Sequence, residues 1–169
     1  MAEVAVRKSR TAGRGVFTLE LLRLGEVVRE FVLEREVTPE APLRPELGES
    51  PEHCPLIDGR FYLVGSPERY LNHSCDPNVY LRFEAERIEI VALRDIEPEC
   101  GLSLDYLINN PGGDSWPCEC AASRCRGETG RSFFALPEDR QREYLPLLAP
   151  WFSKRYSARL EHLRNSRAR

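Results

Sequence analysis

The chain has no apolar run long enough to span a bilayer, so we expect no membrane partner. It also lacks a basic segment followed by an apolar one near its start, which predicts a cytoplasmic protein. Positive charge is not in excess: 24 lysines and arginines stand against 27 acidic residues, and a general nucleic-acid coat is therefore disfavoured. No internal repeat is visible, and 169 residues are enough for one domain with one main core.

Lysine is scarce. Lys8 and Lys154 are the two lysines, and all other basic residues are arginines. A composition bias of the source genome explains this count, because lysine and arginine both serve as solvated surface charge. Charge is uneven along the chain: residues 30–52 carry seven glutamates and two arginines, whereas residues 154–169 carry six basic residues and one acid. We expect an acidic surface and a basic tail.

Short stretches of alternating and β-branched residues predict a mostly β protein. Residues 13–17, Gly-Arg-Gly-Val-Phe, indicate a tight turn between strands. Residues 79–83 and 87–93 are separated by a short polar turn and predict a hairpin. Further strands are expected at residues 27–33 and 60–64.

Three other segments do not resemble strands. Residues 38–55 are rich in proline and glutamate without a sustained period, and predict an irregular insert. Residues 109–114, Asn-Asn-Pro-Gly-Gly-Asp, are a strong loop signal and the best candidate boundary. From Pro137 onward we expect short helices broken near Pro146 and Pro150.

The spacing of three cysteines suggests a metal site. Cys118, Cys120 and Cys125 lie close enough in sequence to wrap one tetrahedral zinc ion, with one ligand missing. The three histidines and the other cysteines are candidates for the fourth ligand, and Cys75 stands out because it lies in a polar turn. The alternative is a set of buried reduced thiols. A closed four-sulfur site would be structural, since it leaves no position for water or substrate.

Two cysteines remain outside this spacing. Cys54 and Cys100 are expected to be small apolar fillers, because nothing near them predicts a lowered thiol pKa. A disulfide framework is the weaker explanation of all six cysteines, since no secretion signal accompanies them.

Several of these segments together resemble a known family. Residues 69–78, Arg-Tyr-Leu-Asn-His-Ser-Cys-Asp-Pro-Asn, then residues 104–106, Leu-Asp-Tyr, then residues 118–127 resemble, in order, two central motifs and the post-SET zinc segment of SET-domain protein lysine methyltransferases. Residues 13–17 match the family's glycine turn, and the resemblance spans roughly residues 3–130. It implies a SET domain at 1–113, a post-SET zinc-binding segment at 114–130 and a C-terminal helical tail at 131–169.

The resemblance also implies an architecture and a chemistry. The fold would be mostly β with short helices, with the Asn-His-Ser-Cys and Asp-Tyr segments crossing in the family's pseudoknot. S-adenosylmethionine would be the cofactor, zinc would be structural, and the substrate would be a protein or peptide bearing a lysine. The fourth zinc ligand, beside Cys118, Cys120 and Cys125, would be Cys75.

Individual roles follow from the same resemblance. Tyr106 would be the catalytic tyrosine that orients the lysine amine and the methyl group, where outside this context it would be an ordinary core tyrosine. The substrate channel would include Phe31, Tyr70 and Leu104. The implied cofactor-binding residues are Gly13, Arg14, Gly15, Asn72, His73, Tyr106 and, stacked on the adenine, Phe133 or Phe134.

The chain departs from the family pattern before and within its second motif. Residues 99–106 lack the usual pair of glutamates, and Leu104 stands where the family places an aromatic residue that controls how many methyl groups are added. Residues 31–33, Phe-Val-Leu, replace a Tyr-x-Gly segment. Both changes remove hydroxyl groups from the channel, so we expect activity beyond monomethylation.

Other functions remain open from the sequence. The departures also fit a catalytically weak SET-like module that binds cofactor or peptide as an interaction protein. A cysteine hydrolase built on His73 and Cys75 is disfavoured, because a thiolate held by zinc cannot also attack a carbonyl. Nucleic-acid binding through residues 153–169 is less favoured than a solvated helix face. The acidic residues 30–52 would suit a basic peptide substrate. The sequence does not indicate the oligomeric state.

Overall fold

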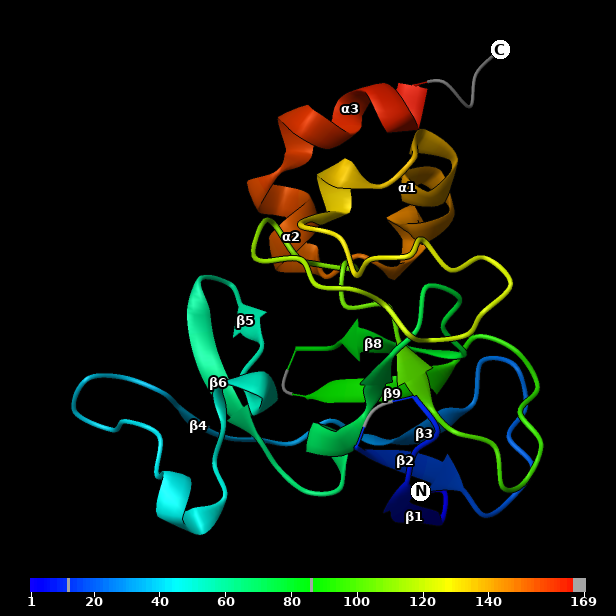
Figure 1. Ribbon diagram of the computed structural model, residues 1–169. Coiled ribbons are helices and arrows are strands. Elements are labelled where there is room, and N and C mark those ends of the chain that lie inside the picture. The colour runs from blue at the N-terminus through cyan, green and yellow to red at the C-terminus, as the bar shows by residue number, and fades with distance from the viewer. Residues whose placement is uncertain (12, 86, 166–169) are drawn as a thin grey trace.

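The structure is a computed structural model and describes residues 1–11, 13–85 and 87–165 (Figure 1). It consists of small sheets with a cap of short helices at the C-terminal end, which confirms the predicted mostly β fold with short helices. The strands are β1 (Val4–Lys8), β2 (Arg14–Thr18), β3 (Val27–Glu30), β4 (Leu33–Glu36), β5 (Leu56–Ile57), β6 (Arg60–Val64), β7 (Asn72–His73), β8 (Val79–Phe83), β9 (Ile88–Ala92) and β10 (Ser103–Leu104).

Two predicted hairpins are present. β1 and β2 pair antiparallel, with Lys8 opposite Arg14 across the glycine turn. β8 and β9 pair antiparallel along their whole length, and β3 adds to the other side of β9. Residues of β9 are almost entirely buried because this strand is the centre of its sheet, where Val28, Val79 and Ile90 form part of the main core.

β7 and β10 form a two-stranded parallel sheet in which Asn72 lies opposite Ser103 and His73 opposite Leu104. The two strands are about thirty residues apart in sequence. Their pairing places the Asn-His-Ser-Cys segment alongside the Asp-Tyr segment, as the sequence resemblance implies.

The single strand expected at residues 27–33 is instead two strands in different sheets. β3 pairs with β9, whereas β4 pairs with β6 in a sheet completed by β5. Between them Phe31 N–H donates to the Ile88 carbonyl at 2.7 Å, and the Val32 carbonyl accepts from Gly65 N–H at 2.9 Å. The chain changes partner at this point because the backbone of Phe31 still bonds to one sheet while that of Val32 already bonds to the other.

The insert predicted at residues 38–55 is irregular, as expected, and contains the 3₁₀ turns η1 (Pro45–Leu47) and η2 (Pro51–His53). Glu49 holds it together, since its buried carboxylate accepts hydrogen bonds from the guanidinium groups of Arg35 and Arg44. Burial of a paired carboxylate rather than an apolar core therefore orders this segment.

The tail is helical and broken at its prolines, as predicted. It contains η4 (Phe133–Ala135), α1 (Glu138–Tyr144), η5 (Leu145–Leu147), α2 (Pro150–Arg155) and α3 (Ser157–Asn165), and η3 (Glu68–Tyr70) is the remaining 3₁₀ turn of the described chain. These helices pack into a second apolar cluster, separate from the core of the sheets, around Phe152, Leu160 and Leu163. They lie together at one end of the molecule (Figure 1). None of the helices described is both long and apolar enough to cross a membrane.

Candidate active site and metal centre

The turn between β1 and β2 brings the backbone against β7. Gly13 has φ of 43°, in the left-handed region that favours glycine. A Cβ at Gly15 would lie 3.1 Å from Asn72 Nδ2 and 3.3 Å from Ser9 Cβ, so only glycine allows this approach without a shift. Asn72 Nδ2 donates to the Arg14 carbonyl at 3.0 Å, and this bond ties the glycine turn to the Asn-His segment.

His73 lies between a cysteine and the tyrosine of the second motif. Its Nδ1 accepts a hydrogen bond from Tyr106 N–H at 3.2 Å, so the ring proton belongs on Nε2, which lies 3.4 Å from Cys75 Sγ. Burial lowers the pKa of His73 to about 4, against the nearby charge of Asp105. The ring is therefore neutral at ordinary pH, and its hydrogen bond to Tyr106 N–H holds the Asn-His-Ser-Cys segment against the Asp-Tyr segment.

Tyr106 follows β10 and points its hydroxyl toward the segment before β7. The hydroxyl donates to the Leu71 carbonyl oxygen at 2.7 Å. The residue keeps 39% of its surface exposed, but its hydroxyl end is enclosed, and this burial raises the pKa of Tyr106 to about 12 with a smaller contribution from the charge of Glu52. Tyr106 is thus a protonated hydroxyl at the edge of accessible space.

A cleft of about 310 Å³ opens beside this tyrosine. The Arg14 guanidinium lies 4.0 Å above the ring of Tyr70, and His53 packs edge-on against the same ring at 5.6 Å between centroids. The lining of the cleft therefore includes cationic, anionic and aromatic side chains. Its lining residues are Gly13, Arg14, Glu52, His53, Arg69, Tyr70, Leu71, Asn72 and Tyr106.

Four cysteines converge on one point, although Cys75 is more than forty residues from the other three in sequence. The Sγ atoms of Cys75, Cys118, Cys120 and Cys125 all lie within 4.8 Å of one another, and none of them is in a disulfide. The chain thus brings together the four thiols that the spacing and the resemblance select.

The sulfur geometry fits a zinc ion. A tetrahedral site with zinc–sulfur bonds of about 2.3 Å separates its sulfurs by about 3.8 Å, and Cys75 Sγ lies 3.7 Å from Cys118 Sγ. Backbone N–H groups of Arg126 and Gly127 point at Cys75 Sγ and Cys125 Sγ, each at 3.4 Å. Such N–H donors stabilise thiolates. In the absence of a cation, burial raises the pKa of the Cys118 thiol to about 12.

The cysteines outside the cluster differ from one another. Cys54 is half-buried, with its thiol 3.5 Å from the Ser50 carbonyl, and burial raises its pKa. Cys100 is exposed, so the expectation that it fills apolar space is wrong. The cause is local: Cys100 lies in the turn that contains Glu99, whose φ is 67°, and the turn faces solvent.

Comparison with known proteins resolves the family. Residues 13–107, more than half of the chain, match the SET domain family. The chain belongs to the SET-domain family. The matched part contains β2 to β10, including the paired motif strands, and the cysteine-rich segment and the helical tail lie beyond it.

Curated relatives of this SET-domain chain are much longer proteins. It is 32% identical over 143 residues to the "Histone-lysine N-methyltransferase, H3 lysine-36 specific" of Aspergillus oryzae, covering 76% of this chain and 15% of that protein. It is 30% identical over 141 residues to the "Histone-lysine N-methyltransferase TRX1" of Oryza sativa subsp. japonica, covering 73% of this chain and 13% of the relative. The chain therefore spans about one seventh of these relatives.

A solved structure supports the fold. The crystal structure of KRYPTONITE in complex with mCHG DNA and SAH is similar over 76% of this chain and 29% of that chain, with a TM-score of 0.56 and 21% sequence identity. At this identity the likeness concerns the SET fold.

Some predicted site residues of the SET chain line the cleft and others do not. Gly13, Arg14, Asn72, Tyr70 and Tyr106 surround it. His73 is behind this wall, in contact with the cysteine cluster.

The structure does not bring the two tail phenylalanines to the cleft. Phe133 is fully buried in the apolar cluster of the tail. One face of Phe134 stacks on Phe152 at 5.6 Å between centroids, and Arg159 lies over its ring at 3.5 Å. Both rings pack within the tail, and neither lines the cleft.

Phe31 and Leu104 lie below the surface. Phe31 is 6% exposed within the main core, and Leu104 is half-buried and packs against the same core. Neither lines the cleft.

Sequence reasoning missed four residues that line the cleft, namely Glu52, His53, Arg69 and Leu71. Arg69 and Leu71 stand within the first motif and could have been taken from it. Glu52 and His53 come from the irregular insert, where no periodicity or motif marks them, so only the fold reveals that η2 reaches the cleft.

Three of the seven glutamates at residues 30–52 pair with arginines of the same chain. Glu34 pairs with Arg69 at 3.1 Å, Glu36 with Arg60 at 3.1 Å, and Glu49 with two arginines. The expected acidic surface is therefore smaller than the glutamate count indicates, because internal arginines use these carboxylates. Glu52 is the glutamate of this region that lines the cleft.

Proposed function

We propose that this chain transfers a methyl group from S-adenosylmethionine to the side-chain amine of a lysine in a protein or peptide. The observation that carries the proposal is one cleft, in a SET-domain chain, that gathers the glycine turn, Asn72 and Tyr106. The curated relatives are histone-lysine methyltransferases by name, which supports the same reaction class.

The cleft supplies groups suited to a cofactor that carries an ammonium, a carboxylate and a sulfonium. Arg14 and Arg69 are cationic and Glu52 is anionic, and the wall between them carries the ring of Tyr70. When bound, S-adenosylmethionine supplies an electrophilic methyl group. We propose that Gly13, Arg14 and Asn72 hold it, together with Tyr106, and that His73 supports this wall from behind through its bond to Tyr106 N–H.

The residues of the chain prepare the lysine. An unperturbed lysine amine has a pKa of about 10.4 and is protonated at neutral pH. Apolar side chains such as Phe31 and Leu104, together with the ring of Tyr70, would exclude water and lower that pKa by desolvation. The Tyr106 hydroxyl and the Leu71 carbonyl, already joined at 2.7 Å, would orient the amine.

His73 has no part in removing the proton in this proposal. Its Nδ1 accepts from Tyr106 N–H and its Nε2 faces Cys75 Sγ, so neither nitrogen is directed at the cleft. Positioning and desolvation, rather than a dedicated base, carry the reaction.

We further propose that Cys75, Cys118, Cys120 and Cys125 hold one structural zinc ion. Four sulfur ligands close the coordination sphere and leave no open position for substrate, so the ion would tie residues 118–125 to the body of the fold. This supports the division into a SET domain at 1–113, a post-SET segment at 114–130 and a helical tail at 131–169, of which residues 166–169 lie outside the described chain.

A methyl-transfer assay tests the proposal. The purified chain is incubated with methyl-labelled S-adenosylmethionine and mixed protein lysates, and the modified lysine is identified by mass spectrometry. Label on lysine that is lost in Tyr106→Phe supports the function. Binding of the cofactor by calorimetry without any transfer would instead indicate a weak module that binds cofactor or peptide, and salt-dependent DNA binding lost on removing residues 153–169 would indicate a nucleic-acid module.

A further inference from the structure

The carboxylate of Asp105, next to Tyr106, is completely buried and fully hydrogen-bonded. Arg126 binds it with both terminal nitrogens, at 2.7 and 3.0 Å. The Tyr144 hydroxyl donates to it at 3.0 Å, and Leu107 N–H donates at 3.1 Å. A buried carboxylate with four donors is held in one place, and removal of a donor leaves an unpaired oxygen.

Tyr144 belongs to α1 in the tail, outside the matched SET domain, and a second residue of the same helix reaches the cysteine cluster. Arg140 is 6% exposed, and its guanidinium donates to the carbonyl of Cys75 at 2.6 Å and to the Tyr144 hydroxyl. Glu143 pairs with Arg124, which lies between Cys120 and Cys125, at 3.1 Å. Positions 140, 143 and 144 fall on one face of a helix, so α1 presents three polar contacts to the cluster and its neighbours.

Two arginines lie against the cysteine cluster. Four thiolates around a divalent zinc ion carry a net charge of about −2. Arg126, whose backbone N–H points at Cys75 Sγ, and Arg140 bring two positive charges to this region, and Asp105 pairs with the first of them. Arg140 pairs with Glu143 at 2.8 Å and also donates to the buried Cys75 carbonyl and to the Tyr144 hydroxyl, so its charge is compensated while its guanidinium is held against the cysteine loop.

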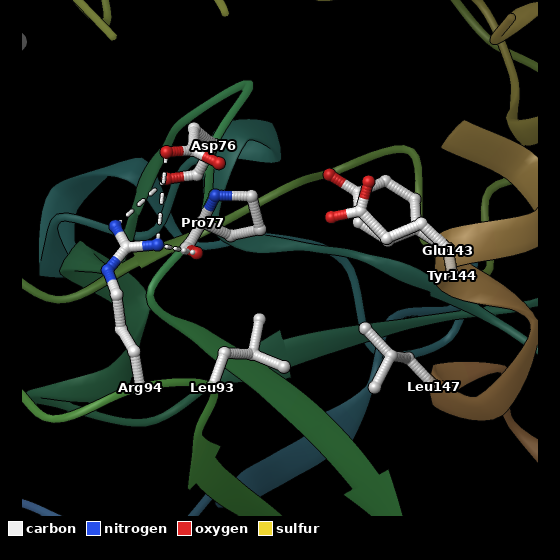
Figure 2. A pocket seen from close by; sticks show the side chains of 7 residues that line it. All are labelled: Asp76, Pro77, Leu93, Arg94, Glu143, Tyr144 and Leu147. Atoms are coloured by element: carbon white, nitrogen blue, oxygen red, sulfur yellow. Dashed lines mark hydrogen bonds and ion pairs between the residues drawn. The ribbon is translucent and has the colours of Figure 1, made fainter. Parts of the chain in front are cut away.

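Apolar packing alone does not fix this contact. Figure 2 shows Glu143, Tyr144 and Leu147 of the tail on one side of a cavity of about 190 Å³. On the other side lie the residues that follow Cys75 and the end of β9, namely Asp76, Pro77, Leu93 and Arg94. Because the space between the two walls is not filled, the hydrogen bonds of Arg140 and Tyr144 set where α1 lies against the cysteine loop.

We infer that Arg140 and Tyr144 are positioning residues for the cysteine cluster, so that the C-terminal helices contribute to metal binding. The inference rests on the zinc site of the proposed function. To that site it adds Arg140, which orients Cys75, and Tyr144, which acts on Arg126 through Asp105. Residues that orient metal ligands from outside the coordination sphere typically change metal affinity by about 10-fold to 100-fold when they are lost.

Zinc release tests the inference without any methyl transfer. The full chain, loaded with zinc, is mixed with the chromogenic chelator 4-(2-pyridylazo)resorcinol, and the rate of zinc release is measured. We expect Tyr144→Phe and Arg140→Gln each to accelerate release by about tenfold or more. In cobalt-loaded protein the same variants should shift the thiolate-to-cobalt absorption bands, and Arg140→Lys should restore part of the wild-type behaviour because it keeps the charge and one donor.

Three variants serve as matched controls. Tyr156→Phe removes a hydroxyl from another tail tyrosine, and Arg142→Gln removes an arginine of α1 that pairs with Glu138 at 2.7 Å. Leu160→Val loosens the apolar cluster of the tail without touching the polar contacts. All three should release zinc at the wild-type rate at temperatures below unfolding.

Three results would overturn the inference. The first is wild-type release in both Tyr144→Phe and Arg140→Gln, and the second is equal acceleration in Leu160→Val, which would attribute the effect to general loosening. The third is a wild-type chain that holds no zinc. A chain that binds zinc but transfers no methyl group would refute the proposed reaction. The zinc-release rates of the variants would still decide the role of α1.

Discussion

The Tyr106 hydroxyl and the Leu71 carbonyl oxygen lie 2.7 Å apart, joining the residue that precedes β7 to the residue that follows the Asp of the second motif. Because β7 and β10 run parallel, Leu71 lies at the start of one strand and Tyr106 beyond the end of the other, and the tyrosine side chain spans this distance to make the bond. The bond leaves a protonated hydroxyl and a carbonyl lone pair at one edge of the cleft.

Tyr106→Phe should lower kcat for methyl transfer by about 100-fold, because an aligned hydrogen-bonding group at a reaction centre contributes about this much. Since burial raises the pKa of Tyr106 to about 12, above its ordinary value of 10, the hydroxyl stays protonated through the working range. Wild-type rates should therefore rise with pH as the substrate amine loses its proton, with no decline below about pH 11. Steady-state rates at stepped pH measure this. Tyr80→Phe, on β8, is the control, and a decline between about pH 8 and 10 would contradict the assignment.

Glu49→Gln should make the folded protein less stable at neutral pH. Hydrogen bonding by Arg44 lowers the pKa of Glu49 from 4.5 to about 2, with a further contribution from Arg35. A lowered folded-state pKa stabilises the fold above about pH 4.5, and this stability is lost as the pH falls toward 2. The unfolding midpoint of the variant should therefore lie below that of the wild type at pH 7 and approach it near pH 2, as followed by circular dichroism. Glu46→Gln, at an exposed position of the same insert, should leave the midpoint unchanged.

Cys120→Ser should abolish zinc binding and lower the unfolding temperature, because a tetrahedral site with three sulfur ligands is no longer closed. Metal content by atomic emission and unfolding by circular dichroism provide the measurement, with the wild type expected to hold one zinc per chain. Removal of the ion from the wild type by a chelator should reproduce the loss of stability.

Cys100→Ser is the matched control for this experiment, since Cys100 is exposed and outside the cluster. It should bind zinc and unfold as the wild type does. Full zinc content in Cys120→Ser would contradict the assigned ligand set.

Gly15→Ala should weaken binding of S-adenosylmethionine by about tenfold or more, because the added methyl group would press on Asn72 Nδ2 at 3.1 Å and on Phe17 at 3.3 Å. The affinity is measured by calorimetry. At Gly112 a Cβ would meet nothing within 4 Å, so Gly112→Ala should bind the cofactor as the wild type does. Equal affinities in the two variants would show that the glycine turn does not shape the cleft.

The wild-type enzyme should add more than one methyl group to a good substrate, because Leu104 and Phe31 bring no hydroxyl to hold a water against the methylated amine. Leu104→Tyr should shift the product toward monomethyl-lysine, as read by mass spectrometry of a substrate peptide. Leu104→Met, which preserves an apolar side chain of similar volume, should leave the distribution unchanged. Exclusive monomethylation by the wild type would refute the expectation.

Local patterns of the sequence predicted the family, the hairpin of β8 and β9 and three of the four clustered cysteines, and the family resemblance added Cys75. Proline also located the breaks in the tail, because it is tolerated in the first turn of a helix, as Pro150 is in α2, but interrupts a helix interior.

Which distant groups meet depends on how the whole chain packs. The change of sheet between Phe31 and Val32, the reach of η2 to the cleft, and the arginine partners of Glu49 depend on contacts between segments whose sequences carry no sign of one another. The same holds for Arg140 and Tyr144: in the sequence they are two polar residues of a short helix, and only packing of α1 against the cysteine loop turns them toward Cys75 and Asp105. Side-chain burial and pairing are set by the whole fold, and a local pattern therefore does not contain them.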